Sequence, residues 1–255
     1  MEAAITSAGH AVQRLAEGGF EVARKANSDP VTTADLEADR ILKEALLGAF
    51  PESGWLSEET RDDARRLACE WVWIVDPIDG TKEYVEGVPH YAVSVALVQA
   101  GQAKLGAVYN PARDELFLGA EGEGVLLNGA PVYARRTMAD RPLLLASRSE
   151  IKRGEFAPFA PAAEIEPVGS IAYKLALVAA GRADATFSLG PKNEWDIAAG
   201  VLLVQAAGGH AHDRHGRPFI FNQPKTLVDS IVAATAQAHA PVLALIAGAE
   251  AGRRG

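Results

Sequence analysis

The segment Trp71–Thr81 reads WVWIVDPIDGT and joins a strand-like run to a group of acidic and small residues. The apolar residues 71–75, rich in β-branched and aromatic side chains, predict a buried strand. Asp76 and Pro77 end that run abruptly, and Asp79 follows three residues after Asp76. A carboxylate at a strand end lies at the edge where open sheets bind their ligands. We therefore expect the chemistry of this protein at this strand end.

Three further carboxylates stand at the ends of predicted elements. Asp35 lies in the first turn of a predicted helix that Thr33 can cap, Glu58 follows a short strand, and Asp196 opens another helix. Taken singly, each is explained as a first-turn helix acid or a solvated loop residue. Together with the two carboxylates of the strand end, they form an oxygen donor set without neighbouring His or Cys. Such a set favours a hard ion such as Mg²⁺ over zinc.

The order of predicted elements changes along the 255 residues. Residues 91–127 read as strands separated by Gly and Pro turns, which predicts an antiparallel meander. Strands and helices alternate after that region, as in α/β proteins. We therefore expect an α+β metal-binding domain over residues 1–135 and an α/β domain over residues 136–255 that completes the site.

The composition excludes several classes of partner. The formal net charge of −8 argues against a nucleic-acid polymer or an anionic membrane surface, because both select basic faces. No apolar run approaches the roughly 18 residues of a membrane span, and the first 25 residues carry charges instead of a signal-peptide core. We expect a cytoplasmic protein. A small phosphorylated substrate stays compatible with the acidic charge, because bound cations reverse the local sign.

The strand end carries the motif DPIDGT at residues 76–81, which resembles the signature of the inositol monophosphatase superfamily. Three other motifs of that superfamily occur in the same order. VTTAD at residues 31–35 resembles its Val-Thr-x-x-Asp, SEE at 57–59 resembles its Gly-Glu-Glu, and WDIAAG at 195–200 matches its Trp-Asp-x-Ala-x-Gly. The resemblance spans about residues 10–248. It implies a five-layer αβαβα sandwich of the inositol monophosphatase and fructose-1,6-bisphosphatase type.

The resemblance also implies a set of metal ligands. Glu58, Asp76 and the backbone carbonyl of Ile78 would hold one Mg²⁺. Asp76, Asp79 and Asp196 would hold a second. Whether a third, more weakly bound ion lies near Glu58 is left undecided, and so is whether the protein forms a homodimer. Two ions about 3.5 to 4 Å apart can stabilise both the attacking and the leaving oxygen of a phosphate ester.

The resemblance assigns the catalytic steps to three residues. Glu58 and the Thr81 hydroxyl would help a water lose its proton, and Asp35 would orient Thr81 by accepting its hydrogen bond. The backbone N–H groups of Gly80 and Thr81 are expected to receive phosphate oxygens. No covalent intermediate is implied.

The residues around the cluster favour a nucleotide substrate. The segment Lys82–Tyr84 reads KEY and looks like the Lys-Glu-Phe of the 3′(2′),5′-bisphosphate nucleotidase branch, and Glu194 and the ASRS segment at 146–149 also fit that branch. Glu150 departs from it, because the branch has His there. We expect hydrolysis of the 3′-phosphate of adenosine 3′,5′-bisphosphate, a product of sulfate assimilation. The expected substrate contacts are Gly80, Thr81, Lys82, Ser147, Arg148, Gly169, Ser170, Lys174, Glu194 and Asp196.

Two other functions stay open at this point. In an inositol monophosphatase or a broad sugar-phosphate phosphatase, Lys82 would be incidental to substrate choice. In a phosphate-binding module without catalysis, the pairing of Asp35 with Thr81 would have no purpose, since binding alone needs no activated water. The sequence therefore favours a phosphomonoesterase and, within that class, the nucleotidase.

Overall fold

The computed structural model describes residues 1–24, 30–137 and 139–252. Its helices are α1 (Glu2–Gly18), α2 (Thr33–Ala49), α3 (Thr81–Val85), α4 (Arg148–Lys152), α5 (Ile171–Ala179), α6 (Glu194–Ala206) and α7 (His239–Gly252), with 3₁₀ helices η1 (Ala64–Ala68) and η2 (Ala157–Phe159).

The strands form two large sheets and two small ladders. The seven-stranded sheet runs in the order β3 (Gly54–Ser57), β4 (Trp71–Asp79), β5 (Ala92–Gln99), β6 (Gln102–Asn110), β7 (Glu115–Ala120), β8 (Gly124–Leu127) and β9 (Ala130–Val132). The five-stranded sheet runs in the order β11 (Glu164–Pro167), β10 (Leu143–Ala146), β12 (Ala185–Ser188), β16 (Ile231–Ala234) and β14 (His210–His212). The ladders pair β1 (Val22–Arg24) with β2 (Pro30–Thr32) and β13 (Lys192–Asn193) with β15 (Leu227–Val228).

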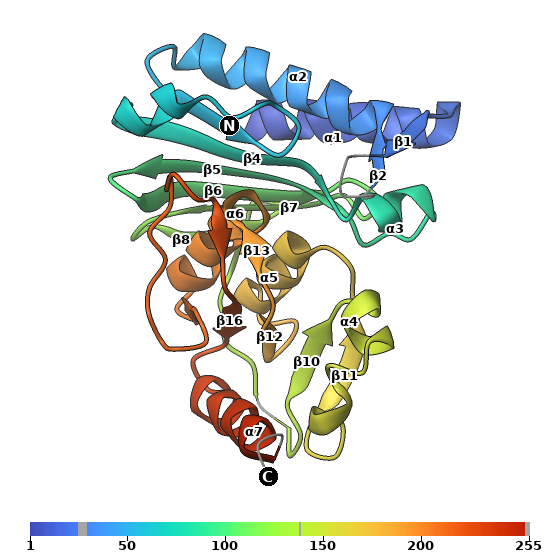
Figure 1. Cartoon of the computed structure of the whole chain (residues 1–255), viewed down its shortest axis with the longest axis vertical. Coiled ribbons are helices and arrows are strands. Elements are labelled where there is room, and N and C mark those ends of the chain that lie inside the picture. The colour runs from blue at the N-terminus through green and yellow to red at the C-terminus, as the bar shows by residue number, and fades with distance from the viewer. Residues whose placement is uncertain (25–29, 138, 253–255) are drawn as a thin grey trace.

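Helical and sheet layers alternate along the long axis of the molecule. Helices α1 and α2 cover the outer face of the seven-stranded sheet, α5 and α6 lie between the two sheets, and α7 covers the far face of the five-stranded sheet (Figure 1). Each sheet buries both of its faces in this way, which is one of the few stable ways of layering amphipathic elements. The expected αβαβα sandwich is confirmed.

Strand β4 contains the apolar run that the sequence identified, and it extends further than predicted. It pairs in parallel with β3 and antiparallel with β5, and it continues past Val75 to Asp79 with a register shift between Asp76 and Asp79. Such irregularities bend a strand and redirect its side chains. The two carboxylates of the motif therefore leave the sheet at an irregular strand end, although the strand does not stop at Asp76.

Helix α2 is capped by Thr32. We had expected Thr33, so that prediction is wrong by one residue. The Thr32 hydroxyl accepts hydrogen bonds from Ala34 N (3.1 Å) and Asp35 N (3.4 Å), and the Asp35 carboxylate accepts one from Thr32 N (2.7 Å). This reciprocal capping box satisfies backbone donors that the helix itself cannot satisfy. It also fixes Asp35 in the first turn.

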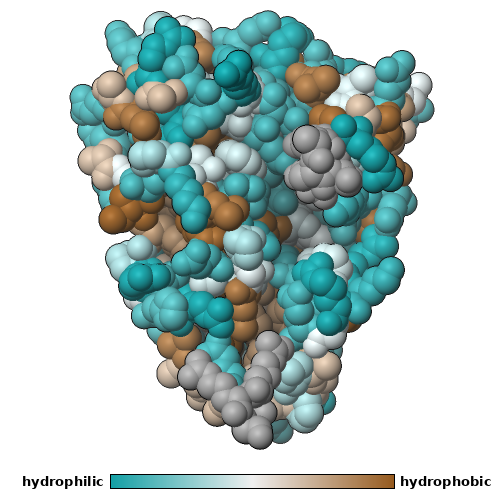
Figure 2. Space-filling model, viewed as in Figure 1, coloured by the Kyte–Doolittle hydropathy of each residue, from teal (hydrophilic) through white to brown (hydrophobic). Residues whose placement is uncertain are grey.

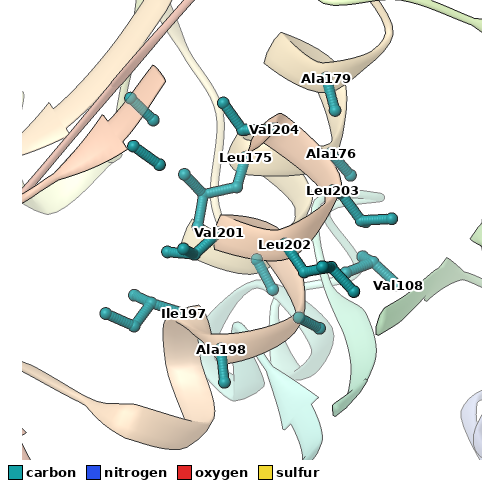
Figure 3. Close-up of a cluster of buried hydrophobic side chains, with 14 of the residues drawn as sticks. Val108, Leu175, Ala176, Ala179, Ile197, Ala198, Val201, Leu202, Leu203 and Val204 are labelled. Carbon is teal, nitrogen blue, oxygen red and sulfur yellow. The ribbon is translucent and has the colours of Figure 1, made fainter. Parts of the chain in front are cut away.

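The middle layer has an apolar surface on every side. All of α5 is buried, and side chains of α6 such as Val201 and Leu203 pack beside Leu175 and against Val108 of β6 (Figure 3). Gly200 permits the close approach of the two helices, since a Cβ there would lie 2.5 Å from the Leu175 side chain.

The two halves of the chain share this buried layer. The same cluster reaches both sheets, because it includes Phe117 of β7 and Ala233 of β16. The division at residues 135 and 136 therefore remains a proposal about the chain.

Several shorter elements differ from the predicted ones. The charged segment after Glu58 forms the 3₁₀ helix η1, and the short helices α3 and α4 have no counterpart among the elements expected from the sequence. The surface is hydrophilic over most of the face in Figure 2, with hydrophobic residues in small separate groups. Within the described ranges, no helix is both long and apolar enough to cross a membrane.

Candidate active site

A pocket of about 360 Å³ opens where α3, α4 and the first turns of α5 and α6 meet. Twelve of the predicted site residues line it: Glu58, Asp76, Ile78, Asp79, Gly80, Thr81, Lys82, Ser147, Gly169, Ser170, Lys174 and Asp196. The other three, Asp35, Arg148 and Glu194, are described but do not line it. The fold therefore gathers residues from both halves of the chain at one place.

Three carboxylates of the pocket lining lie close together. Oxygens of Glu58, Asp76 and Asp196 lie within 4.8 Å of one another. Burial raises the pKa of Asp76 well above its usual range, and the charges of Glu58 and Asp79 raise it further. The pKa of Asp196 is raised by burial and then by Asp79 and Glu58. Like charges buried together are costly unless a cation balances them. This oxygen-only cluster therefore fits a hard divalent cation such as Mg²⁺.

Asp79 lies beside this cluster and is held by the first turn of α5. Its Oδ2 accepts hydrogen bonds from the Ser170 hydroxyl (2.7 Å) and from Ala172 N (2.6 Å). Burial raises the pKa of Asp79 to about 6, although these hydrogen bonds oppose the shift. The Ser170 hydroxyl also accepts from Tyr173 N (3.0 Å) and so caps the helix. Ser170 thus contacts a predicted metal ligand, in addition to lining the pocket as expected.

Thr81 and Asp35 make the hydrogen bond that the resemblance implied. The Thr81 hydroxyl lies 3.0 Å from Asp35 Oδ1 and 3.0 Å from the carbonyl oxygen of Ile78. Asp35 is buried behind Thr81, and its other oxygen accepts from the Thr32 backbone (2.7 Å) and hydroxyl (2.6 Å). Burial raises the pKa of Asp35, and the Thr32 and Thr81 bonds partly offset that effect. The geometry is present, and the catalytic role stays a prediction.

Two glycines let separate segments approach closely at the rim of the pocket. Gly80 has φ 97°, a left-handed conformation that glycine adopts without strain, and it starts α3. A Cβ at Gly80 would lie 2.9 Å from the carbonyl oxygen of His90. A Cβ at Gly169 would lie 2.8 Å from the same oxygen and 2.5 Å from Glu83. Larger residues would therefore push the turn after β4 and the segment that leads into α5 away from His90.

A buried ion pair forms another part of the pocket. Lys174 is only 1% exposed, and its Nζ lies 3.5 Å from Glu150 Oε2. The same carboxylate accepts from Ser147 N (3.0 Å) and the Ser147 hydroxyl (2.6 Å), in the capping box of α4. Burial opposes ionisation of Glu150, but Lys174 and Ser147 outweigh it and lower the pKa to about 2. Lys174 is therefore already balanced by an acid of the same wall.

Sequence reasoning missed nine residues of the pocket lining, and three charged ones among them matter for the chemistry. Glu150, Arg153 and Lys192 all line it. The spacing of Ser147 and Glu150 is a capping-box signal and could have located Glu150. Arg153 and Lys192 are single cations outside any motif, so no local pattern distinguishes them from solvated surface charges.

Two predicted substrate contacts point elsewhere. The Glu194 carboxylate is buried and accepts hydrogen bonds from the backbone of Asn222 (2.6 Å) and Gln223 (2.9 Å). Arg148 forms an exposed ion pair with Glu86 (2.6 Å). The structure thus gives both side chains protein partners outside the pocket, which differs from the expectation.

Comparisons with known proteins agree with this geometry. A profile of the inositol monophosphatase family matches residues 1–248. The chain is 37% identical over 212 residues to an inositol-1-monophosphatase of Rhizobium meliloti, covering 77% of each chain. It is 36% identical over 206 residues to Nus factor SuhB of Xylella fastidiosa, covering 77% of this chain and 74% of that protein. An IMPase structure from Thermotoga maritima has a TM-score of 0.84 at 27% identity, covering 97% of this chain and 95% of that one.

Proposed function

The chain belongs to the inositol monophosphatase family and is a metal-dependent phosphatase, and we propose that its preferred substrate carries a second phosphate, as adenosine 3′,5′-bisphosphate does. One observation carries the proposal. Lys82, Arg153 and Lys192 line the same pocket as the carboxylate cluster, and they come from three different elements or loops. The phosphate to be cleaved lies at the carboxylate cluster, so these cations can pair with a phosphate that is not cleaved.

The chain's own residues supply most of the arrangement for hydrolysis. Glu58, Asp76 and Asp196 would hold Mg²⁺, with Asp79 and the Ile78 carbonyl as further ligands. When bound, the ion stabilises the leaving oxygen and lowers the pKa of a nucleophilic water.

The hydrogen bond between Thr81 and Asp35 gives Thr81 its part in that reaction. Thr81 has a single hydroxyl proton, and Asp35 can accept the hydrogen bond that this proton makes. The Thr81 oxygen is then an acceptor that orients the water for attack on phosphorus.

Inositol 1-phosphate is the second candidate substrate. A relative at 37% identity is named inositol-1-monophosphatase. In addition, Glu194 and Arg148, which supported the nucleotidase reading of the sequence, have partners outside the pocket. The nucleotidase proposal therefore depends on the cations that do line it.

Turnover of a substrate panel by the wild-type protein in Mg²⁺ tests the proposal. The panel contains adenosine 3′,5′-bisphosphate, adenosine 3′-monophosphate, inositol 1-phosphate and fructose 1,6-bisphosphate. We expect kcat/KM for the bisphosphate nucleotide to exceed that for its monophosphate by about 10-fold or more, the worth of one charge-assisted contact. Higher activity on inositol 1-phosphate than on the bisphosphate would reject the proposal and leave the phosphatase assignment intact.

A variant of Lys82 sharpens this test. Lys82→Ala should lower kcat/KM for adenosine 3′,5′-bisphosphate by about 10- to 150-fold, and for the monophosphate much less. Lys104→Ala is the matched control, because Lys104 pairs with Glu121 outside the pocket. Equal losses on both substrates would mean that Lys82 supports α3 in general.

The proposal includes the partners expected from the sequence. The substrate is a small phosphorylated molecule, and neither a nucleic-acid polymer nor a membrane is required. Cytoplasmic location, a homodimer and the number of Mg²⁺ ions stay predictions.

A further inference from the structure

Glu58 and Asp196 belong to one carboxylate cluster but come from different parts of the fold. Glu58 follows β3, an edge strand of the seven-stranded sheet, whereas Asp196 lies in the first turn of α6. Like charges that lie close together and are partly shielded from water repel one another, so their repulsion favours opening of the cluster when no cation is bound. Other contacts must therefore hold these two segments in place.

The segment around Glu58 is anchored first to helix α2. Asp39 of α2 accepts hydrogen bonds from the Ser57 hydroxyl (2.5 Å) and the Thr60 hydroxyl (2.6 Å). Asp39 is 8% exposed, so these bonds are shielded from water. They bracket Glu58 on both sides, and they leave the later part of its loop to be fixed by other contacts.

Arg66 fixes the end of that loop to a distant part of the chain. Its guanidinium contacts both oxygens of Asp62 (2.6 and 3.0 Å) and donates to Asn222 Oδ1 (2.6 Å) and to the carbonyl oxygen of Gln223 (2.9 Å). Arg66 is 2% exposed. The planar group can make these contacts at once because its donors have a fixed geometry. It therefore joins the loop after Glu58 to residues 222–223.

Glu194 binds the backbone of the same two residues, Asn222 and Gln223. Its carboxylate accepts from Asn222 N (2.6 Å) and Gln223 N (2.9 Å), and its own backbone N–H donates to Thr226 O (2.8 Å). Asn222 has φ 60°, a left-handed conformation that Asn tolerates better than most residues. Glu194 precedes Asp196 by two residues in the first turn of α6. The contacts thus run without a break from the loop of Glu58 to the helix of Asp196.

We propose that Arg66 and Glu194 are positioning residues that hold the Glu58 and Asp196 carboxylates together and so set the affinity of the site for its divalent cation. Both lie among the described residues, and neither lines the pocket. Their effect is therefore on the metal site and not on contacts with the substrate. The inference rests on the metal dependence of the phosphatase and is independent of which ester is cleaved.

Calorimetric titration of Mg²⁺, and of Mn²⁺ as a second probe, into the full chain without substrate tests this proposal. Arg66→Lys keeps the charge but loses the planar donor set, and Glu194→Gln keeps the size but loses one acceptor. We expect either change to weaken cation binding by about 10-fold, because a looser link between the two segments positions their carboxylates less well for the ion. At saturating metal, the KM for substrate should stay near the wild-type value.

Arg65→Lys is the matched control on the same 3₁₀ helix. Arg65 is 91% exposed and pairs with Asp63, so its replacement should leave cation affinity unchanged. The double variant of Arg66 and Glu194 should lose little more cation affinity than the single variant that binds the cation less tightly. The two losses should not add, because both residues act through residues 222–223.

Thermal unfolding of each variant distinguishes a residue that positions the metal ligands from one that only stabilises the fold. If Arg66→Lys does not fold, Glu194→Gln carries the test alone. A lower melting temperature with wild-type cation affinity in the folded Glu194→Gln protein would overturn the proposal. Since no substrate is present, that result would not bear on the nucleotidase assignment.

Discussion

The pocket contains a group of carboxylates around Asp76 and a separate carboxylate, Glu150, and the two differ in what balances their charge. Asp76 and Asp196 lie among other carboxylates, and burial together with that repulsion raises the pKa of each. Glu150 is buried as well, but Lys174 and the Ser147 hydrogen bonds lower its pKa to about 2. The charge of the first group is balanced only when a cation is added, whereas Glu150 has a cation of the same chain, Lys174, beside it. Removing a carboxylate charge from the group around Asp76 should therefore abolish activity but relieve repulsion. Removing the charge of Glu150 should instead lower stability.

Asp76→Asn should have the largest effect. Asp76 belongs to the carboxylate group and is predicted to bridge two ions, so its loss should remove several kcal/mol of transition-state stabilisation, about 1,000-fold or more in turnover. In EDTA the variant should melt at a higher temperature than the wild type, because one of the repelling charges is gone. Phosphate release and thermal unfolding measure the two effects. Near-wild-type turnover in a folded variant would contradict the metal assignment.

Glu150→Gln should act in the opposite sense, on stability. Removing one partner of a buried ion pair leaves Lys174 unbalanced and should cost about 3 kcal/mol at neutral pH, measured by urea unfolding. The folded-state pKa of Glu150, about 2, is below its ordinary value of 4.5. The stability it contributes is thus fully present above pH 4.5 and is lost as pH falls toward 2. The gap between wild type and variant should close over that interval, and a constant gap would contradict the pairing.

Thr81→Ala tests whether the carboxylate side of the pocket acts in the chemical step. The variant loses the hydroxyl that donates to Asp35, so kcat should fall by about 100-fold with a much smaller change in KM. Thr81→Ser retains a hydroxyl and is the matched control. An effect confined to KM would make Thr81 a substrate-binding residue.

The smallest effect is the stabilisation of the wild type by its cation. Mg²⁺ at ten times its dissociation constant should stabilise the protein by about 1.4 kcal/mol for one site, seen as a higher melting temperature. Asp76→Asn should lose most of this gain, while Glu150→Gln should keep it. Equal stabilisation of all three proteins would mean that the cation binds elsewhere.

The parts of the fold that could be predicted from sequence depend on contacts near in sequence. The run before Asp76 and the meander after it show long apolar patterns interrupted by turn residues, so β4 to β8 could be predicted. Helices α3 and α4 have five residues each, too few for a periodic pattern to emerge. The capping error at Thr33 was avoidable, because Thr32 and Asp35 have capping-box spacing.

The site residues that belong to a motif could be predicted from the sequence. The residues whose position or partner is set by tertiary contacts could not. The DPIDGT motif located five residues of the pocket lining, between Asp76 and Thr81. Nothing local indicates that Glu194 binds the backbone of residues 222–223, or that Glu150 pairs with Lys174 at a separation of 24 residues. The partner of a buried charge is chosen by the fold as a whole, and a single sequence does not display it.

The position of α6 between the two sheets has a consequence for motion. Most of its side chains are buried, and it has no outer face that could fray into solvent. Its backbone amides should therefore exchange with deuterium only when the whole protein unfolds, while those of α7 in the outer layer exchange through local opening. The Asp196 end of the site is then carried on an element that opens only with the whole protein.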